Sequence, residues 1–144
     1  MITMQVLYTA EAQSTGEGRG GKVRTSDGTL EIDLAVPKEM GGEGGGSNPE
    51  QLFAAGYAAC FHSALKLLGR RAKADVTGSV VTAEVGIGRG EGAGFGLAVT
   101  LVVDLPEIDR AAAEQLVEQA HQVCPYSNAV RGNIEVDLRL GQTR

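Results

Sequence analysis

Two cysteines are the residues of this chain that could do the most chemistry. Cys60 lies in the apolar stretch QLFAAGYAACFHSAL, Cys124 lies in HQVCPYSNAVRG, and the 144-residue sequence contains no other cysteine. A thiol can fill a hydrophobic core, bind a metal ion or take part in redox chemistry. The first residues, MITMQVLYTAEAQ, lack the basic and apolar regions of a signal peptide, which predicts a cytoplasmic location. In that compartment a disulfide is more often catalytic than structural.

The setting of each cysteine indicates which one would attack in a redox pair. Glycine inside a buried helix costs about 1 kcal/mol relative to alanine, so Gly56 and Tyr57 suggest a helix break just before Cys60. A break would place Cys60 in the first turn of a new helix, where unpaired N–H groups and the dipole favour a thiolate. Cys124 would end a helix, where the dipole disfavours a thiolate. If the two form a pair, Cys60 attacks and Cys124 resolves, and a core-filling role for Cys60 stays open.

The two histidines make a metal site the alternative. His62 and His121 form the patterns C-x-H and H-x-x-C with the cysteines, and zinc accepts these ligand types. On a helix, residues 60 and 62 point about 200° apart, so they cannot face one ion or form a Cys–His nucleophile pair. His121 and Cys124, three positions apart, could share an ion. The spacing favours His62 as a hydrogen-bonded core residue and His121 as a partly exposed one, with a zinc-binding structural domain as the alternative.

Some cation other than a neighbouring histidine would have to lower the pKa of the Cys60 thiol. Arg19, in GEGRGGKV, is the candidate, because the flanking glycines allow close approach of the backbone. An isolated arginine in such a loop is otherwise a solvated surface residue. Both interpretations of Arg19 are open from its local sequence.

Glu50 also has two interpretations. Ser47-x-x-Glu50 matches a capping box at the start of a helix. Alternatively, Asn48 caps the helix, Pro49 takes its first position, and Glu50 is left to point inward. On a straight helix Glu50 and Cys60 would lie about 15 Å apart. Only the suggested break lets both reach one site, so composition and spacing alone favour the capping role.

The elements that must position these residues can be read from periodicity. Four segments alternate apolar and polar side chains with the period of a half-buried strand, and a fifth does so weakly. The four are residues 29–36, 80–87, 95–105 and 134–140, and the weak one is 5–12. The glycine-rich run at residues 41–49 predicts a flexible loop leading into a helix.

Two segments have helical periodicity, from about Pro49 to Leu68 and from about Arg110 to Cys124. Asp109 is a good N-cap for the second helix. Pro125 stops that helix, because proline cannot continue it. Strands before, between and after two helices predict an α+β fold with mostly antiparallel sheets.

The first of these helices is apolar nearly all round and must be covered on every side. Four or five strands of one small domain can cover one side only. We therefore expect a homodimer with these helices central and an interface above about 2,000 Å², the size of an obligate interface.

Length and composition limit the number of domains and the kinds of partner that the chain can have. A chain of 144 residues with 42% hydrophobic and 22% charged residues is a single globular domain, residues 1–144, that can bury its own core. The net charge of −5 argues against a nucleic-acid partner, because binding phosphates needs a basic face. The apolar stretch 52–68 is mostly alanine and contains polar residues, which favours a buried helix over a membrane span.

Four motifs together resemble the organic hydroperoxide resistance (Ohr) branch of the Ohr/OsmC family. In chain order they are GRGGKVRTSDGTLEIDLAVPKEMGG, GGSNPEQLFAAGYAACFHSAL, GFGLAVTLVVDLPEID and CPYSNAVRGNIEVDL. The combination of CPYSNA with NPEQLFAAGYAACF is highly specific. In the OsmC branch the corresponding segments look different, with a valine-type residue where Tyr126 stands. Only the slightly long glycine run, residues 41–46, departs from the pattern, and it affects a loop.

The resemblance implies an intertwined homodimer of the OsmC-like fold that acts as a thiol-dependent peroxidase. Cys60 falls on the family's peroxidatic cysteine and Cys124 on its resolving cysteine, while Arg19 and Glu50 fall on the pair that activates the thiolate. The family reduces organic peroxides, including fatty-acid hydroperoxides, and is recharged by lipoylated proteins. It uses no metal, haem or flavin as a cofactor.

Apolar side chains near these positions could form a pocket that suits an alkyl chain better than hydrogen peroxide. The predicted substrate-binding residues are Leu52, Phe53, Phe61, Phe95 and Tyr126. The same pocket makes a non-catalytic lipid-binding module the second alternative. Loss of two free thiols per chain after one equivalent of organic peroxide would distinguish the peroxidase from this module.

Overall fold

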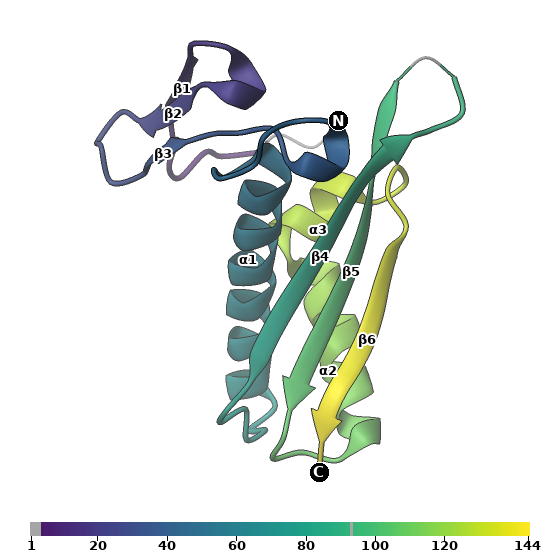
Figure 1. Ribbon diagram of the computed structural model, residues 1–144. Coiled ribbons are helices and arrows are strands. Elements are labelled where there is room, and N and C mark those ends of the chain that lie inside the picture. The colour runs from purple at the N-terminus through teal and green to yellow at the C-terminus, as the bar shows by residue number, and fades with distance from the viewer. Residues whose placement is uncertain (1–3, 93) are drawn as a thin grey trace. The chain divides into compact units, whose positions relative to one another are not determined.

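The computed structural model describes residues 4–92 and 94–144 (Figure 1). They form two compact units, of which the first extends to Pro49 and the second runs from Glu50 to Arg144. Each unit carries one three-stranded sheet, and the helices belong mainly to the second unit, so the predicted α+β class is confirmed. The prediction of one domain spanning residues 1–144 stays a prediction.

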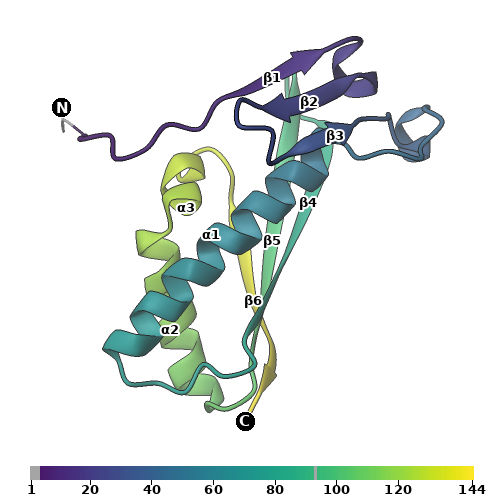
Figure 2. The same cartoon turned by 90° about the vertical axis from the view of Figure 1, so that its left-hand side faces the viewer.

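The second unit contains the long elements of the chain. Its helices are α1 (Pro49–Arg71), α2 (Arg110–Val123) and α3 (Pro125–Val130), and its strands are β4 (Val80–Arg89), β5 (Phe95–Leu105) and β6 (Val136–Thr143). β4 and β5 form an antiparallel hairpin, whereas β5 and β6 run parallel. A parallel pair needs a crossover of a dozen or more residues, and α2 and α3 provide it. Both views place α1 and α2 on the same face of this sheet (Figures 1 and 2).

The core of the second unit lies between this sheet and the two long helices. Alternate residues of β5 and one stripe of α2 are buried there, which confirms the periodicity predicted for residues 95–105 and 110–124. The buried members of this core are Tyr57, Phe61, Leu65, Val99, Leu101, Val103, Leu105, Ala113, Leu116, Val117, Ala120, Cys124 and Val130. Burying each of the larger side chains contributes about 1.5–3 kcal/mol, so this core holds the helices in place.

Both ends of α2 lie where the sequence predicted them, and its C-terminal end leads into a short helix that was not predicted. The Asp109 carboxylate accepts a hydrogen bond of 2.8 Å from the backbone N–H of Ala112, which confirms the N-cap. The helix ends at Val123, before Pro125, as predicted. The same proline then begins the short helix α3, because its fixed φ suits the first helical position.

Helix α1 corrects the sequence analysis at Gly56. The predicted break is absent, because α1 is continuous from Pro49 to Arg71. The glycine is explained instead by a close approach. A Cβ atom at Gly56 would lie 2.8 Å from the Tyr126 hydroxyl oxygen and 3.2 Å from two atoms of its ring. Cys60 therefore lies in the middle of a straight helix, not in the first turn of a new one.

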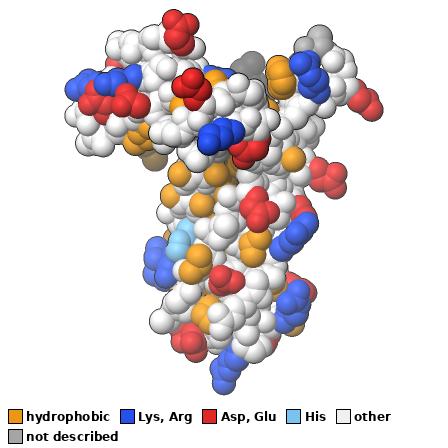
Figure 3. All heavy atoms as spheres, in the orientation of Figure 1, with side chains coloured by type: hydrophobic (Ala, Val, Ile, Leu, Met, Phe, Trp, Pro, Cys, Tyr) orange, Lys and Arg blue, Asp and Glu red, His pale blue; other side chains and the backbone are white. Residues whose placement is uncertain are grey.

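One side of α1 is left uncovered within the described chain. The exposed residues Ala55, Ala59, Ser63 and Leu67 recur every four positions and form a stripe along the helix. Figure 3 shows apolar side chains on the part of the second unit that α1 occupies. By length and composition α1 is apolar enough to cross a membrane, with a mean hydropathy of 1.2. A central helix of a soluble protein has the same properties.

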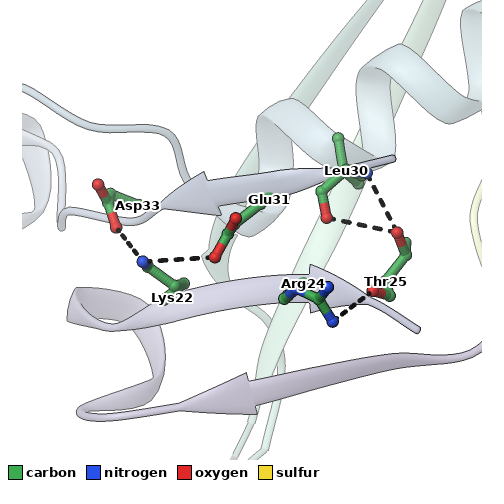
Figure 4. Close-up of polar contacts among 6 residues, drawn as sticks. All are labelled: Lys22, Arg24, Thr25, Leu30, Glu31 and Asp33. Atoms are coloured by element: carbon green, nitrogen blue, oxygen red, sulfur yellow. Dashed lines mark hydrogen bonds and ion pairs between the residues drawn. The ribbon is translucent and has the colours of Figure 1, made fainter. Parts of the chain in front are cut away.

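The first unit is a small antiparallel sheet of β1 (Ala12–Thr15), β2 (Lys22–Thr25) and β3 (Glu31–Asp33), with short 3-10 helices η1 (Gly18–Gly20) and η2 (Lys38–Met40). Ion pairs link its strands: the Lys22 ammonium lies 3.5 Å from the Glu31 carboxylate and 3.8 Å from that of Asp33 (Figure 4). Strand β2 was not predicted, because KVRT has a single large apolar residue and depends on its neighbours for pairing.

The weak strand prediction for residues 5–12 is wrong for all but its last residue. Residues 5–11 are irregular, and β1 begins at Ala12. The apolar side chains that suggested a strand are not covered: Val6, Leu7 and Tyr8 are 60%, 93% and 79% exposed. An alternating pattern stabilises a strand only when one of its faces is buried.

Candidate active site

The structure brings the two cysteines together. Cys60 projects from the middle of α1 and is half-buried, whereas Cys124 is fully buried between α2 and α3. Both are free thiols, and the Cys124 thiol is a hydrogen-bond partner of the Cys60 thiol. Two neighbouring thiols, one half-buried and one enclosed, can form a disulfide after the half-buried one is oxidised.

Burial and two neighbouring residues, Tyr126 and Cys124, set the pKa of the Cys60 thiol. Burial is the largest influence and raises the pKa of the Cys60 thiol. The backbone N–H of Tyr126 donates to the sulfur and lowers this pKa, whereas negative charge on Cys124 raises it. The net direction is upward. Tyr126 is the second residue of α3, where backbone N–H groups have no partner within the helix. The helix end that favours a thiolate thus belongs to α3, and not to a broken α1 as predicted.

Cys124 occupies a junction that the sequence analysis described only in part. It is the C-cap of α2, as expected, but it is also the N-cap of α3. The negative end of one helix and the positive end of another therefore meet at this residue. The dipole argument from the end of α2 alone does not hold for Cys124.

Aromatic rings gather beside Cys60. The ring of Tyr126 lies 6.2 Å from that of Phe53 and 5.7 Å from that of Tyr57, and Phe53 lies 6.2 Å from Tyr57. Each centroid distance falls in the range of favourable aromatic pairs. Two of the predicted pocket residues, Phe53 and Tyr126, are thus brought together, and the unpredicted Tyr57 completes a triangle of rings with them.

The other predicted pocket residues lie in different settings. Leu52 is half-buried on the first turns of α1. Phe61 is fully buried in the core of the second unit. Phe95 begins β5, is 63% exposed, and has the Arg89 guanidinium 5.0 Å from its ring centroid. The contacts of Phe61 and Phe95 are therefore with the core and with Arg89.

A buried hydrogen-bonded chain runs beside the cysteines and was not predicted. The Ser127 hydroxyl lies 2.7 Å from the Tyr57 hydroxyl and 2.8 Å from Nδ1 of His121. Tyr57 and Ser127 are fully buried. A spacing signal was present, because Tyr57 precedes Cys60 by three residues and Ser127 follows Cys124 by three. Residues three apart on a helix share a face.

Each of the two histidines forms a hydrogen bond with a serine hydroxyl. Nε2 of His62 lies 2.8 Å from the Ser79 hydroxyl, which confirms the predicted hydrogen bond, whereas the ring is half-buried and, contrary to the prediction, not part of the core. His121 is half-buried against Ser127. Burial lowers the pKa of both rings. Among residues 4–92 and 94–144, no three His, Cys, Asp or Glu side chains gather to hold a metal ion. The zinc alternative therefore lacks a ligand set in this part of the chain.

Arg19 and Glu50 are placed within their own elements. Arg19 is the middle residue of η1 in the first unit, and Glu50 lies in the first turn of α1. Because α1 is continuous, ten residues separate Glu50 from Cys60 by about 15 Å along the axis. The argument that a break lets Glu50 approach Cys60 is wrong. The role of Arg19 and Glu50 beside the thiol stays a prediction from the resemblance.

Comparisons with known proteins agree with the motifs and the fold. The model of the OsmC-like protein family matches residues 42–139. An organic hydroperoxide resistance protein of Xanthomonas axonopodis pv. citri is 53% identical over 138 residues, which are 94% of this chain and 96% of that protein.

Solved structures extend the agreement to the fold. The crystal structure of an organic hydroperoxide resistance protein from Elizabethkingia anophelis superposes with a TM-score of 0.91 at 51% identity, over 96% of this chain and 99% of that one. The organic hydroperoxide resistance protein OhrB of Bacillus subtilis gives 0.86 at 42% identity, over 94% and 100%. The chain therefore belongs to the OsmC-like protein family, in the branch of the organic hydroperoxide resistance proteins.

Proposed function

We propose that the chain is a thiol-dependent peroxidase that reduces organic hydroperoxides to alcohols. The observation that carries this proposal is the contact between the half-buried Cys60 thiol and the fully buried Cys124 thiol. The names of its relatives, organic hydroperoxide resistance proteins, support the same class of substrate. The reactivity of a free cysteine, more often than its packing, decides its role in a protein.

The reaction proceeds in two steps at this pair. The Cys60 thiolate attacks the distal oxygen of the hydroperoxide, so that an S–O bond forms and the O–O bond breaks. The alkoxide leaves and takes up the proton that the thiol lost, which gives the alcohol. Cys60 becomes a sulfenic acid. Cys124 then displaces its hydroxyl as water, which gives the Cys60–Cys124 disulfide. A dithiol, such as the lipoyl group of a lipoylated protein, reduces this disulfide and completes the cycle.

The Cys60 thiolate needs more stabilisation than the residues of the second unit provide. The net influence of the described surroundings raises the pKa of the Cys60 thiol, with burial as the main cause. We propose that the Arg19 guanidinium offsets this burial and also stabilises the charge that develops on the leaving oxygen. Glu50 would hold Arg19 in place through a bidentate pair. The resemblance supports this assignment.

An apolar surface beside the thiol suits an alkyl hydroperoxide better than hydrogen peroxide. Phe53 and Tyr126 offer ring faces next to α1, and Leu52 extends the apolar surface along the helix. Contact with these groups would contribute about 25 cal/mol for each Å² of alkyl surface removed from water. Hydrogen peroxide has no such surface. Fatty-acid hydroperoxides are the substrate class that we favour, and Phe61 and Phe95 remain predicted members of the pocket.

We further propose that the protein acts in the cytoplasm as an intertwined homodimer. The support is the exposed stripe on α1, made of Ala55, Ala59, Ser63 and Leu67, where small side chains would let a second copy approach closely. Ala59→Arg should dissociate the dimer in sedimentation velocity experiments. Ala111→Arg, which changes an exposed alanine of α2, should leave it intact. A monomeric wild-type protein at micromolar concentration would refute this assembly.

A peroxidase assay with a dihydrolipoyl reductant tests the function directly. We expect turnover with a fatty-acid hydroperoxide to exceed turnover with hydrogen peroxide. One equivalent of the organic peroxide should remove two free thiols per chain. A lipid-binding module, the alternative that the aromatic cluster would also suit, should lose none. Metal analysis of the purified protein tests the zinc-binding alternative.

A further inference from the structure

Three helices meet at a single hydroxyl group. The Ser127 hydroxyl on α3 lies 2.7 Å from the Tyr57 hydroxyl on α1 and 2.8 Å from Nδ1 of His121 on α2. Tyr57 and Ser127 have no exposed surface, so water does not compete for these hydrogen bonds. The three side chains form one buried chain that runs from the half-buried imidazole to the phenol.

The phenol end of this chain lies at the cysteine pair. Tyr57 precedes Cys60 by three residues on the continuous helix α1, so the two side chains share a face. Burial is the largest cause that raises the pKa of Tyr57, and the Ser127 hydroxyl lowers it. Negative charge on Cys124 and on Cys60 raises it as well. The Tyr57 hydroxyl is therefore close enough to feel the charge on both sulfurs.

Each hydroxyl of the chain carries one proton, so the chain can run in two directions. When Nδ1 of His121 lacks a proton, Ser127 donates to it and Tyr57 donates to Ser127. The single proton of Tyr57 is then used inside the chain. When Nδ1 carries a proton, it donates to Ser127, and Ser127 donates to Tyr57. The Tyr57 proton is then available to another acceptor.

We propose that Tyr57, Ser127 and His121 form a directional hydrogen-bonded relay that assists formation of the Cys60–Cys124 disulfide. Tyr57 is the catalytic residue of this relay, because it donates a hydrogen bond to the hydroxyl that leaves Cys60. His121 and Ser127 are positioning residues that set the direction of the relay. The inference rests on the proposed function, because it concerns the second step of that reaction.

The assisted step balances without a further reagent. The Cys124 sulfur attacks the sulfur of the Cys60 sulfenic acid, the S–S bond forms, and the S–O bond breaks. The departing hydroxide and the proton of Cys124 leave together as one water molecule. A hydrogen bond from Tyr57 stabilises the negative charge that builds up on this oxygen while the S–O bond breaks.

The charges around His121 give the relay a pH dependence. Burial and the Arg131 guanidinium lower the pKa of His121, and Glu118 raises it. Glu118 also lines a surface hollow together with Arg139 of β6. The titratable groups toward α1 are Tyr57 and the thiols. A neutral imidazole permits both directions, whereas a protonated one permits only the donating direction. The relay therefore assists most below the lowered pKa of His121.

The test measures disulfide formation from the sulfenic acid in a single turnover. Reduced protein is mixed with one equivalent of an organic hydroperoxide between pH 5 and 8, quenched with acid, alkylated and analysed by mass spectrometry. His121→Asn keeps an amide near the Nδ1 position without a group that titrates. His62→Gln is the matched control, because His62 also bonds a serine hydroxyl but lies outside the relay.

We expect the ratio of the wild-type rate to the His121→Asn rate to rise as the pH falls through the lowered pKa of His121, while pH effects common to both proteins cancel. His62→Gln should follow the wild-type profile. Tyr57→Phe should slow disulfide formation by about a hundredfold, the low end of acid–base assistance. Ser127→Ala interrupts the same relay, so the ratio of the wild-type rate to its rate should change over the same pH range. This variant keeps the test available if His121→Asn fails to fold.

Two outcomes would overturn the relay. One is a constant ratio of wild type to His121→Asn at every pH. The other is an equal loss of pH dependence in His62→Gln. If the wild-type protein loses thiols on adding peroxide and either outcome is found, the proposed function stands and the relay is refuted. A wild-type protein that loses no thiols overturns both.

Discussion

Cys60 and Cys124 are the same residue type held by opposite kinds of structure. Cys60 lies within 23 continuous residues of α1, where hydrogen bonds on both sides fix its backbone, and its thiol is half-buried. Cys124 lies where the chain leaves one helix and enters the next, with an extended backbone at ψ 124°, and it is fully buried. The helical position of Cys60 presents its thiol to an incoming molecule. The corner between α2 and α3, where Cys124 lies, presents the Cys124 thiol only to Cys60.

The difference also indicates which side moves when a disulfide forms. A disulfide requires Cα atoms about 4.4–6.8 Å apart and a restricted dihedral angle. Shifting Cys60 would disturb the hydrogen bonds of α1, whereas Cys124 makes no side-chain cap bond to α3. One backbone hydrogen bond to each helix holds Cys124, from its N–H to Ala120 and to its carbonyl from Asn128. Side chains add to these, including the Arg131 guanidinium, which donates to the His121 carbonyl oxygen at 2.7 Å. We expect this corner to adjust while α1 stays in place.

The largest expected effect comes from removing the enclosed thiol. Cys124→Ser should complete one turnover with an organic hydroperoxide and then stop, because no second thiol can displace the hydroxyl from Cys60. Sulfenic acid should accumulate at Cys60, and more peroxide should overoxidise it irreversibly. Mass spectrometry of the intact protein follows both products. Cys60→Ser is the control and should not react. Normal cycling of Cys124→Ser with a dithiol would show that the disulfide is dispensable.

The next effect concerns the reachable thiol. Arg19→Ala should raise the pKa of Cys60 by about 1–3 units, the shift that a nearby opposite charge produces. Reduction of the peroxide at neutral pH should slow accordingly, since the thiolate is the nucleophile. Glu50→Ala should act in the same direction but more weakly, by releasing Arg19. The pH dependence of Cys60 alkylation measures both changes.

An unchanged alkylation profile in Arg19→Ala would mean that another group stabilises the thiolate and that the assignment is wrong. If Glu50→Ala lowers the stability of the helix but leaves the reactivity of Cys60 alone, Glu50 is a capping residue. The two substitutions thus separate the capping and activating interpretations of Glu50.

Substituting the two glycines of α1 should have a smaller effect, on stability, and the effect should differ between the two positions. A Cβ at Gly69 would lie 2.7 Å from a methyl group of Val76, and Gly69 is buried. Gly69→Ala should therefore lower the free energy of unfolding by about 1–3 kcal/mol through overpacking. Gly56→Ala meets the ring of Tyr126, which is 38% exposed and can turn aside. Its cost should be offset by the gain of about 1 kcal/mol in helix propensity.

Urea unfolding compares the two glycine variants, and the peroxidase assay separates them further. Gly56→Ala should slow peroxide reduction, because it displaces the ring of Tyr126, a predicted substrate-binding residue. Gly69→Ala should leave the rate for the folded protein unchanged. Equal effects on activity would show that the approach of Tyr126 to α1 has no role in the site.

The smallest effect is expected at the far end of α2. Asp109→Ala removes the acceptor for the Ala112 N–H and should cost about 1 kcal/mol of stability. Activity should not change, because the cap lies at the opposite end of α2 from Cys124. Asp109→Ser keeps an oxygen at the cap position and should retain most of the stability. Loss of activity in Asp109→Ala at a temperature where it is folded would show that the whole of α2 positions the corner.

The sequence by itself determined the features that depend on neighbours along the chain. The alternation in residues 80–87 and 95–105 predicted β4 and β5, and the stripe of α2 predicted the face that is buried. Asp109 and Pro125 set the ends of α2 through their own side chains. The four motifs were enough to identify the family, and with it the two cysteines as the residues to examine.

Only the tertiary structure decided what depends on residues far apart. Gly56 looked like a helix break, and it is instead the place where Tyr126 packs against an unbroken α1. The hydrogen bond between Tyr57 and Ser127 joins residues 70 positions apart. No local pattern encodes such contacts, because they form only when the sheet and the three helices have buried their apolar faces together. The backbone N–H that reaches Cys60 comes from α3 for the same reason.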